Sequence, residues 1–129
     1  MAGKAASNME GQMIRNPKNS EHYTWGANCD GWHLVRDGKL SVIYERMPPG
    51  TSETRHHHNQ AQQFFFVLEG AAVLEVEGKE IKLGKHDGVH VLAGQAHQMF
   101  NRSESDLVFL VISQPPSHGD RSYTDHSEP

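Results

Sequence analysis

The stretch from residue 50 to residue 70 reads GTSETRHHHNQAQQFFFVLEG. Within it, His56 and His58 are two residues apart. On a β-strand their side chains therefore project from the same face, about 7 Å from each other, while His57 projects from the other face. His56 and His58 can thus reach one metal ion. Taken alone, the pair also fits a polar strand at the rim of a barrel that holds no ligand.

Gln63 follows after a turn, at the start of a mainly apolar strand. It has the same parity as Phe65 and Val67, so the three side chains share one face. If that face is buried, an unpaired glutamine amide costs roughly 1 to 3 kcal/mol, and a metal ion is one partner that removes this cost. The alternative is a hydrogen bond inside the core, beside a site made of three histidines only.

A third histidine, His97, lies 39 residues after His58, at the end of the sequence LAGQAH. A glycine-bearing turn delivers it to the start of a strand, where it shares one face with Met99. Three imidazoles with open coordination positions favour a divalent transition metal (Zn, Fe, Ni, Cu or Mn) over Mg or Ca. The ligand types do not choose among these transition metals.

Short strands separated by tight turns account for the rest of the pattern. Glycine-bearing dipeptides such as Asp37-Gly38 and Glu77-Gly78 supply the backbone angles that tight reversals need. Many short strands with such turns indicate an all-β sandwich or closed barrel. The expected strands cover residues 32–36, 40–47, 54–58, 63–68, 72–77, 79–83, 88–92, 97–101 and 107–113.

Length and composition bound the organisation and the partners. A chain of 129 residues fits one domain, and its polar ends predict a flexible N-terminal arm over residues 1–20 and a polar C-terminal tail over 115–129, with a barrel over 21–114. Twelve basic residues against sixteen acidic ones, without a basic stripe, argue against a nucleic-acid partner. Apolar runs of at most six residues predict no membrane helix. A single cysteine and the lack of a leader pattern favour the cytoplasm.

The two histidine motifs resemble those of the cupin superfamily. The first motif is matched by Gly50, His56, His58, Gln63 and Gly70, and the second by Asp87, Gly94, His97 and Asn101. Three positions depart from the pattern: Gln63 replaces a glutamate, His86 a glycine and Leu92 a proline. The resemblance covers roughly residues 40–113. It implies an antiparallel double-stranded β-helix, or jelly-roll barrel, of the small single-domain type, with His56, His58 and His97 as metal ligands and Gln63 in the place of the usual carboxylate.

The resemblance also implies classes of function. One is a metalloenzyme acting on a small molecule, either a dioxygenase that cleaves a ring or enediol or an isomerase. Because Gln63 replaces the glutamate that often serves as base, the isomerase is the weaker of the two, and no catalytic residue is assigned. The expected apolar pocket consists of Phe65, Val67, Val89, Val91 and Met99. A small-molecule binding or sensing module and a degenerate cupin without metal are the alternatives.

The opposite face of the strand after the histidines carries Phe64, Phe66 and Leu68. In a closed barrel this face points outward and is too apolar to remain in contact with water. We expect it to pack against a second copy of the chain in a homodimer. Burial under the N-terminal arm is the alternative.

Overall fold

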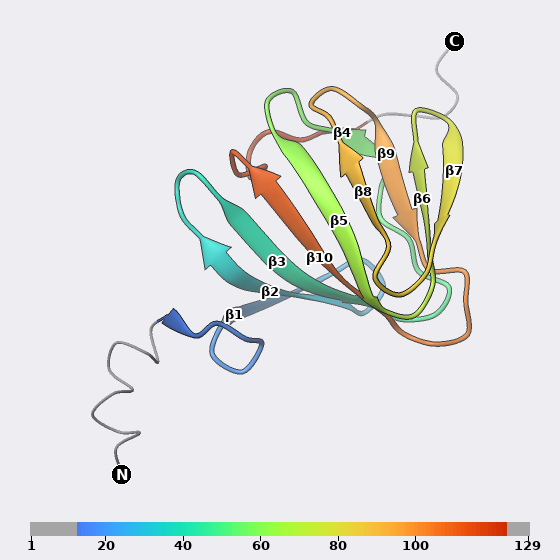
Figure 1. The fold of residues 1–129 in the computed structure, drawn as a ribbon, viewed down its shortest axis with the longest axis horizontal. Coiled ribbons are helices and arrows are strands. Elements are labelled where there is room, and N and C mark those ends of the chain that lie inside the picture. Colours follow the sequence, from blue (N-terminus) through green and yellow to red (C-terminus); the bar gives the residue numbers. More distant parts are fainter. Residues whose placement is uncertain (1–12, 124–129) are drawn as a thin grey trace.

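The computed structural model describes residues 13–123 of the chain and forms eleven strands from them, in two antiparallel sheets (Figure 1). All nine expected strands are present: Lys79–Leu83 has the expected ends and the other eight differ at one or both ends. Two more strands, Glu21–Trp25 and Ser122–Tyr123, flank them. The described part of the chain has no helix long and apolar enough to cross a membrane. Most of the expected N-terminal arm, residues 1–12, lies outside the described residues.

The larger sheet occupies the left and centre of Figure 1 and the smaller sheet its right side. The larger sheet has the order β1 (Glu21–Trp25), β2 (Cys29–Arg36), β3 (Ser41–Met47), β10 (Leu107–Gln114), β5 (Gln62–Glu69) and β8 (Gly88–Val91). The smaller sheet has the order β11 (Ser122–Tyr123), β4 (His56–His57), β9 (His97–Phe100), β6 (Ala72–Val76) and β7 (Lys79–Leu83). Strands distant in sequence are thus neighbours in each sheet, as expected for a jelly-roll barrel.

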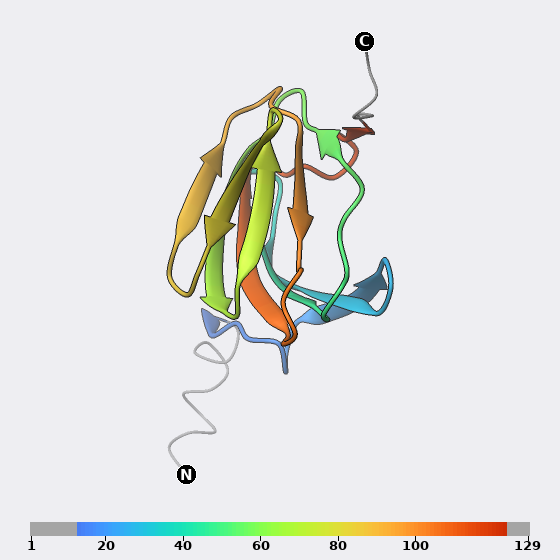
Figure 2. The same ribbon diagram turned by 90° about the vertical axis from the view of Figure 1, so that its right-hand side faces the viewer.

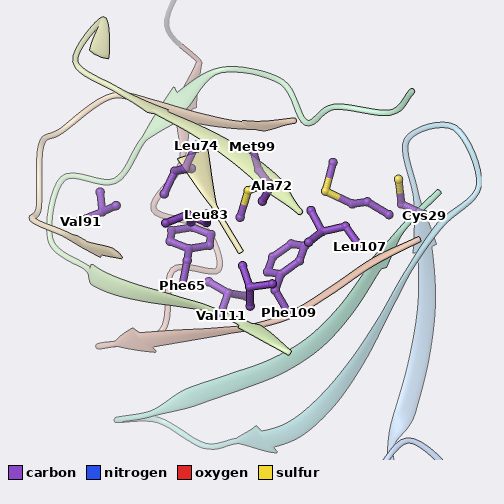
Figure 3. Close-up of a cluster of buried hydrophobic side chains, with 12 residues drawn as sticks. Cys29, Phe65, Ala72, Leu74, Leu83, Val91, Met99, Leu107, Phe109 and Val111 are labelled. Atoms are coloured by element: carbon purple, nitrogen blue, oxygen red, sulfur yellow. The ribbon is translucent and has the colours of Figure 1, made fainter. Parts of the chain in front are cut away.

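Burial alternates along the strands with a period of two residues, and this alternation fixes which face of each strand points into the barrel. In β5, Gln63, Phe65 and Val67 are buried, and the residues between them face outward. The inward side chains meet those of the other sheet in one apolar cluster (Figure 3). Leu74 and Phe109, from opposite sheets, are 0% and 1% exposed, and each side chain buried in this way contributes about 1.5 to 3 kcal/mol.

One turn has a strict steric requirement. Gly70, between β5 and β6, has φ of +89°, a left-handed conformation that side chains disfavour. A Cβ at this position would also overlap with the Asp106 carbonyl oxygen. The glycine therefore lets the β5–β6 connection pass against the chain that enters β10.

The described part of the expected polar C-terminal tail, residues 115–123, is tied to the barrel by strand pairing and hydrogen bonds. β11 pairs with β4, and Figure 2 shows its dark red arrow beside the green arrow of β4. The Asp120 carboxylate accepts hydrogen bonds from the backbone N–H groups of Asn59 (3.0 Å), Gln60 (2.9 Å) and Ala61 (3.0 Å). These partners lie about sixty positions earlier, so local composition carries no sign of them.

Candidate metal centre

Two adjacent strands of the smaller sheet bring the three histidines together. His56 on β4 lies directly opposite His97 on β9, and His58 follows just after β4. Their ligand nitrogens all lie within 4.8 Å of one another. The three side chains are at most 2% exposed. The predicted convergence of His56, His58 and His97 is thus present in the structure.

Each imidazole is oriented by a hydrogen bond from Nδ1 to a backbone carbonyl. The acceptors are Thr54 for His56 (2.7 Å), Asp120 for His58 (2.8 Å) and Gln95 for His97 (3.0 Å). A carbonyl oxygen only accepts, so Nδ1 carries the proton and the Nε2 lone pair is left for a ligand. Metal-binding histidines are commonly held in this way. The Nε2 atoms of His58 and His97 are buried and have no hydrogen-bond partner within residues 13–123.

Gln63 presents a buried oxygen that, like the Nε2 atoms of His58 and His97, has no hydrogen-bond partner within residues 13–123. It is 6% exposed, and its Nε2 donates to Ser113 Oγ at 2.9 Å. Its Oε1 is buried and has no hydrogen-bond partner in the described part of the chain. Phe65, two residues further along the same face of β5, contacts His97 with a distance of 5.6 Å between ring centroids. The face of Gln63 therefore looks toward the histidines, and direct ligation by its amide oxygen stays a prediction.

The electrostatics of the site favour neutral imidazoles. Burial, followed by the charge of Arg121, lowers the pKa of His56 to about 3. Burial also lowers the pKa of His97 to about 4 and shifts that of His58 downward. At neutral pH all three rings therefore carry lone pairs, as metal ligation requires. The unpartnered buried atoms and this protonation state show that the residues fit a divalent transition metal.

A buried carboxyl group that the sequence analysis missed lies on β3. Glu45 is 9% exposed and accepts a hydrogen bond from the Tyr23 hydroxyl at 3.0 Å. Burial raises the pKa of Glu45 to about 8 and also raises the pKa of Tyr23. A Cβ at Gly31, on the strand between them, would overlap with the Tyr23 ring. The signal in the sequence was an acidic residue with the parity of Met47, on the inward face of an expected strand.

Glu53 is a second carboxyl group that the sequence analysis did not assign. Its backbone N–H donates to the Met99 carbonyl, and its Oε1 accepts from the Met99 N–H, both at 3.0 Å. Since Met99 lies two residues after His97 on the same face, Glu53 sits about 7 Å along the strand direction from that histidine. Burial raises the pKa of Glu53 to about 7.

Other expected positions are distributed as follows. Phe65, Val67, Val91 and Met99 are at most 3% exposed, and Val89 packs against them partly buried. Their role as a substrate pocket stays a prediction. His90, to which the sequence assigns no role, is exposed on the outer face of β8, where its ring bonds to the Gln62 side chain at 2.8 Å.

The comparison with protein families matches the fold and the histidine pattern. Residues 43–113 match the cupin domain model. The chain belongs to the cupin family. TcmJ, a tetracenomycin polyketide synthase protein of Streptomyces glaucescens, is 34% identical over 72 residues, which are 54% of this chain and 48% of TcmJ. An uncharacterized Streptomyces coelicolor protein, SCO3923, is 33% identical over 89 residues, 67% of this chain and 83% of its own length.

Solved structures agree on the fold. A predicted oxalate decarboxylase of Thermotoga maritima superposes with a TM-score of 0.73 at 22% identity, covering 81% of this chain and all of the other. At this identity the likeness shows the cupin barrel and does not transfer an activity. The chain spans about half the length of TcmJ.

Proposed function

We propose that this cupin is a metal-dependent enzyme that moves a proton on a small substrate bound in the barrel. His56, His58 and His97 would hold a divalent transition metal, with Gln63 Oε1 as the fourth protein ligand. The observation that carries the proposal is the buried Glu45 carboxyl group, which lies on the inward face of the same barrel and has a raised pKa. A bound divalent ion would polarise and orient a substrate oxygen.

Glu45 is suited to accept and return a proton. A general acid or base works best when its pKa lies near the working pH, and burial raises the pKa of Glu45 to about 8. The Tyr23 hydroxyl donates to one of its oxygens, Oε2, which fixes the orientation of the carboxyl group. Glu53, with a pKa raised to about 7, is the second proton carrier. Groups perturbed in this way gather at functional sites.

The apolar side chains beside the histidines would exclude water from the reaction. Phe65 contacts His97 edge to face, and Met99 follows His97 on the same face of β9. Together with Val67, Val89 and Val91 they form the proposed pocket. A site closed in this way strengthens each electrostatic interaction inside it.

Solvent exchange tests the proposed proton transfer without knowledge of the product. Metal-loaded protein in D₂O is incubated with small hydroxy acids, keto acids and aldoses, and NMR follows the loss of C–H signals. We expect exchange on at least one compound, slowed about 100-fold or more by Glu45→Gln and unchanged by Glu69→Gln, which alters an exposed carboxylate on β5. Exchange by Glu45→Gln at the wild-type rate would refute the role of Glu45.

Oxygen-dependent cleavage is the second candidate. The feature that favours it is the neutral donor set, because among residues 13–123 no carboxylate accompanies the three histidines in their cluster and oxygen chemistry at a metal needs none. A polyketide synthase protein among the relatives makes aromatic diphenols reasonable compounds to try. Oxygen uptake with diphenols, flavonols and diketones, in the absence of C–H exchange, would favour this candidate. Tight binding without either reaction would indicate a binding module.

We also propose a homodimer through the outer face of the larger sheet. Phe64 is 38% exposed there, its ring stacks with that of Phe66, and Leu110 and Ile112 on β10 lie beside them. A contiguous apolar face of this kind is typical of an interface. We expect sedimentation velocity to show a dimer, converted to monomer by Phe64→Lys together with Phe66→Lys. A monomeric wild-type protein at micromolar concentration would contradict the proposal.

A further inference from the structure

The segment after β10 carries a cation to the metal centre. Asp120 anchors this segment twice, since its carboxylate accepts three backbone N–H groups of the loop after His58 and its carbonyl accepts from His58 Nδ1. β11 then continues the segment along β4, with Ser122 opposite His57. The residue between these two fixed points is Arg121.

The strand register directs Arg121 toward the histidines. Ser122 pairs with His57 in an antiparallel ladder, so the same register continued by one position places Arg121 beside His58, just past the end of β4. Arg121 lines a groove of about 940 Å³ that also contains Tyr23 and His33. It lines a second hollow as well, of about 250 Å³, together with Glu45 and Glu53. Arg121 thus lines both hollows.

The guanidinium of Arg121 has no hydrogen-bond or ion-pair partner within residues 13–123, and the residue is exposed. Four other arginines have a carboxylate partner: Arg36 with Glu21, Arg46 with Asp30, Arg55 with Glu75 and Arg102 with Glu80. The positive charge of Arg121 adds to the lowering of the pKa of His56 and partly opposes the rise in the pKa of Glu45 and Glu53. Arg121 therefore lies near both the histidines and the two carboxyl groups.

The balance of charge in the site calls for an anion. Three imidazoles and one amide offer a divalent ion no negative charge, so both of its charges remain to be offset. Burial raises the pKa of Glu45 and Glu53 toward neutrality, which limits how far they neutralise Arg121. A guanidinium forms paired hydrogen bonds with the oxygens of a carboxylate or a phosphate.

We propose that Arg121 binds the anionic oxygen group, a carboxylate or a phosphate, of a small organic substrate whose other end reaches the histidine centre. This inference rests on the proposed function. It adds the class of substrate and names the residue that selects it. The groove beside Arg121 gives such a substrate its entry, and Asp120 holds the cation in place.

The test uses the full chain loaded with Co²⁺, whose visible absorption reports ligands that enter the metal site. Malonate, methyl phosphate and neutral imidazole are titrated in parallel, so that the first two separate a carboxylate from a phosphate. We expect Arg121→Gln to weaken the preferred anion roughly 10- to 100-fold, as for the loss of a hydrogen bond to a charged group, and to leave imidazole affinity unchanged. Arg121→Lys should lie between the two proteins.

Arg36→Gln is the matched control, because Arg36 lines the same groove but is already paired with Glu21. It should bind both anions as the wild type does. Equal anion affinity of Arg121→Gln and wild type, or no anion binding by the wild type, would overturn the inference. Co²⁺ uptake in the same experiment would still support the proposed metal centre. If no Co²⁺ binds, the proposed function fails. The role of Arg121 is then tested by calorimetry on the metal-free protein, in which Arg121→Gln must still bind the anion more weakly than the wild type does.

Discussion

Gln63→Glu should tighten metal binding and weaken the metal-free fold at the same time. The side chain is 6% exposed and donates to Ser113 Oγ at 2.9 Å. In the metal-free protein the substitution removes the amide group that donates to Ser113, and the new carboxyl group must be desolvated. Together these effects cost about 1 kcal/mol or more. For a domain of this size that is a fall in Tm of about 4 °C. With metal bound, an anionic oxygen replaces a neutral one, and a tenfold gain in affinity adds about 1.4 kcal/mol.

The assay compares thermal unfolding at pH 7.5 with and without a stoichiometric excess of Zn²⁺, together with competition against a chromophoric chelator. We expect the metal-induced rise in Tm to be larger in Gln63→Glu than in wild type, although the metal-free variant melts lower. Gln62→Glu is the control, because Gln62 is exposed and bonds to Gln114, so the same charge is added away from the site. A metal-induced rise in Gln63→Glu no larger than in wild type would show that Gln63 is not a ligand.

Two further predictions concern the role of Asp120 and the pH dependence of the stability. Asp120→Ala should weaken metal binding about tenfold, as is typical when a group that orients a ligand is lost, and chelator competition that gives the wild-type affinity would contradict this. The unfolding free energy of the metal-free protein, from urea titrations, should fall as the pH drops from about 6.5 toward 4, because folding lowers the pKa of three histidines, His56, His58 and His97. These three outnumber the two carboxyl groups, Glu45 and Glu53, whose raised pKa values act in the opposite direction above about pH 4.5. It should also fall as the pH rises from about 6.5 through 8, because folding raises the pKa of Glu53 to about 7 and of Glu45 to about 8; a Glu45→Gln variant with the same alkaline loss as wild type would rule out its contribution.

The proposed set of protein ligands is neutral, and this has a consequence for the metal that it would hold. Affinity should be lower than in a site that includes a carboxylate, and the ion should polarise a bound substrate more strongly, because no protein charge offsets it. The three carbonyl acceptors at Nδ1 compensate in part, since each holds its ring in the tautomer that a metal needs.

The sequence could predict those parts of the fold that depend on local patterns, namely the alternation of side chains along a strand and the turns between strands. The alternation in β5 and the two-residue spacing of His56 and His58 fix which side chains share a face, and the turn before His97 sets the start of β9. These predictions required only the strand period of two. The family model over residues 43–113 covers the same part of the chain.

What sequence could not predict depends on contacts between distant segments. Asp120 reaches the loop after His58 from about sixty positions away, and a polar segment of this kind reads as solvated coil. Glu45 was overlooked because an acidic residue inside a strand reads as outward facing, while here the Tyr23 hydroxyl satisfies it in the interior. The partner residue in each contact cannot be identified from the strand period, although the parity of Glu45 with Met47 does place Glu45 on the inward face.

The metal content of tag-free protein tests the central claim most directly. Elemental analysis should find close to one equivalent of a transition metal in the wild type, and the content should fall at least tenfold in His97→Ala, which removes one buried Nε2 from the cluster. His57→Ala, altering the histidine between two of the ligands but on the opposite face of β4, should retain the wild-type content. No stoichiometric metal in the wild type, or equal metal in wild type and His97→Ala, would contradict a metal centre built on His56, His58 and His97.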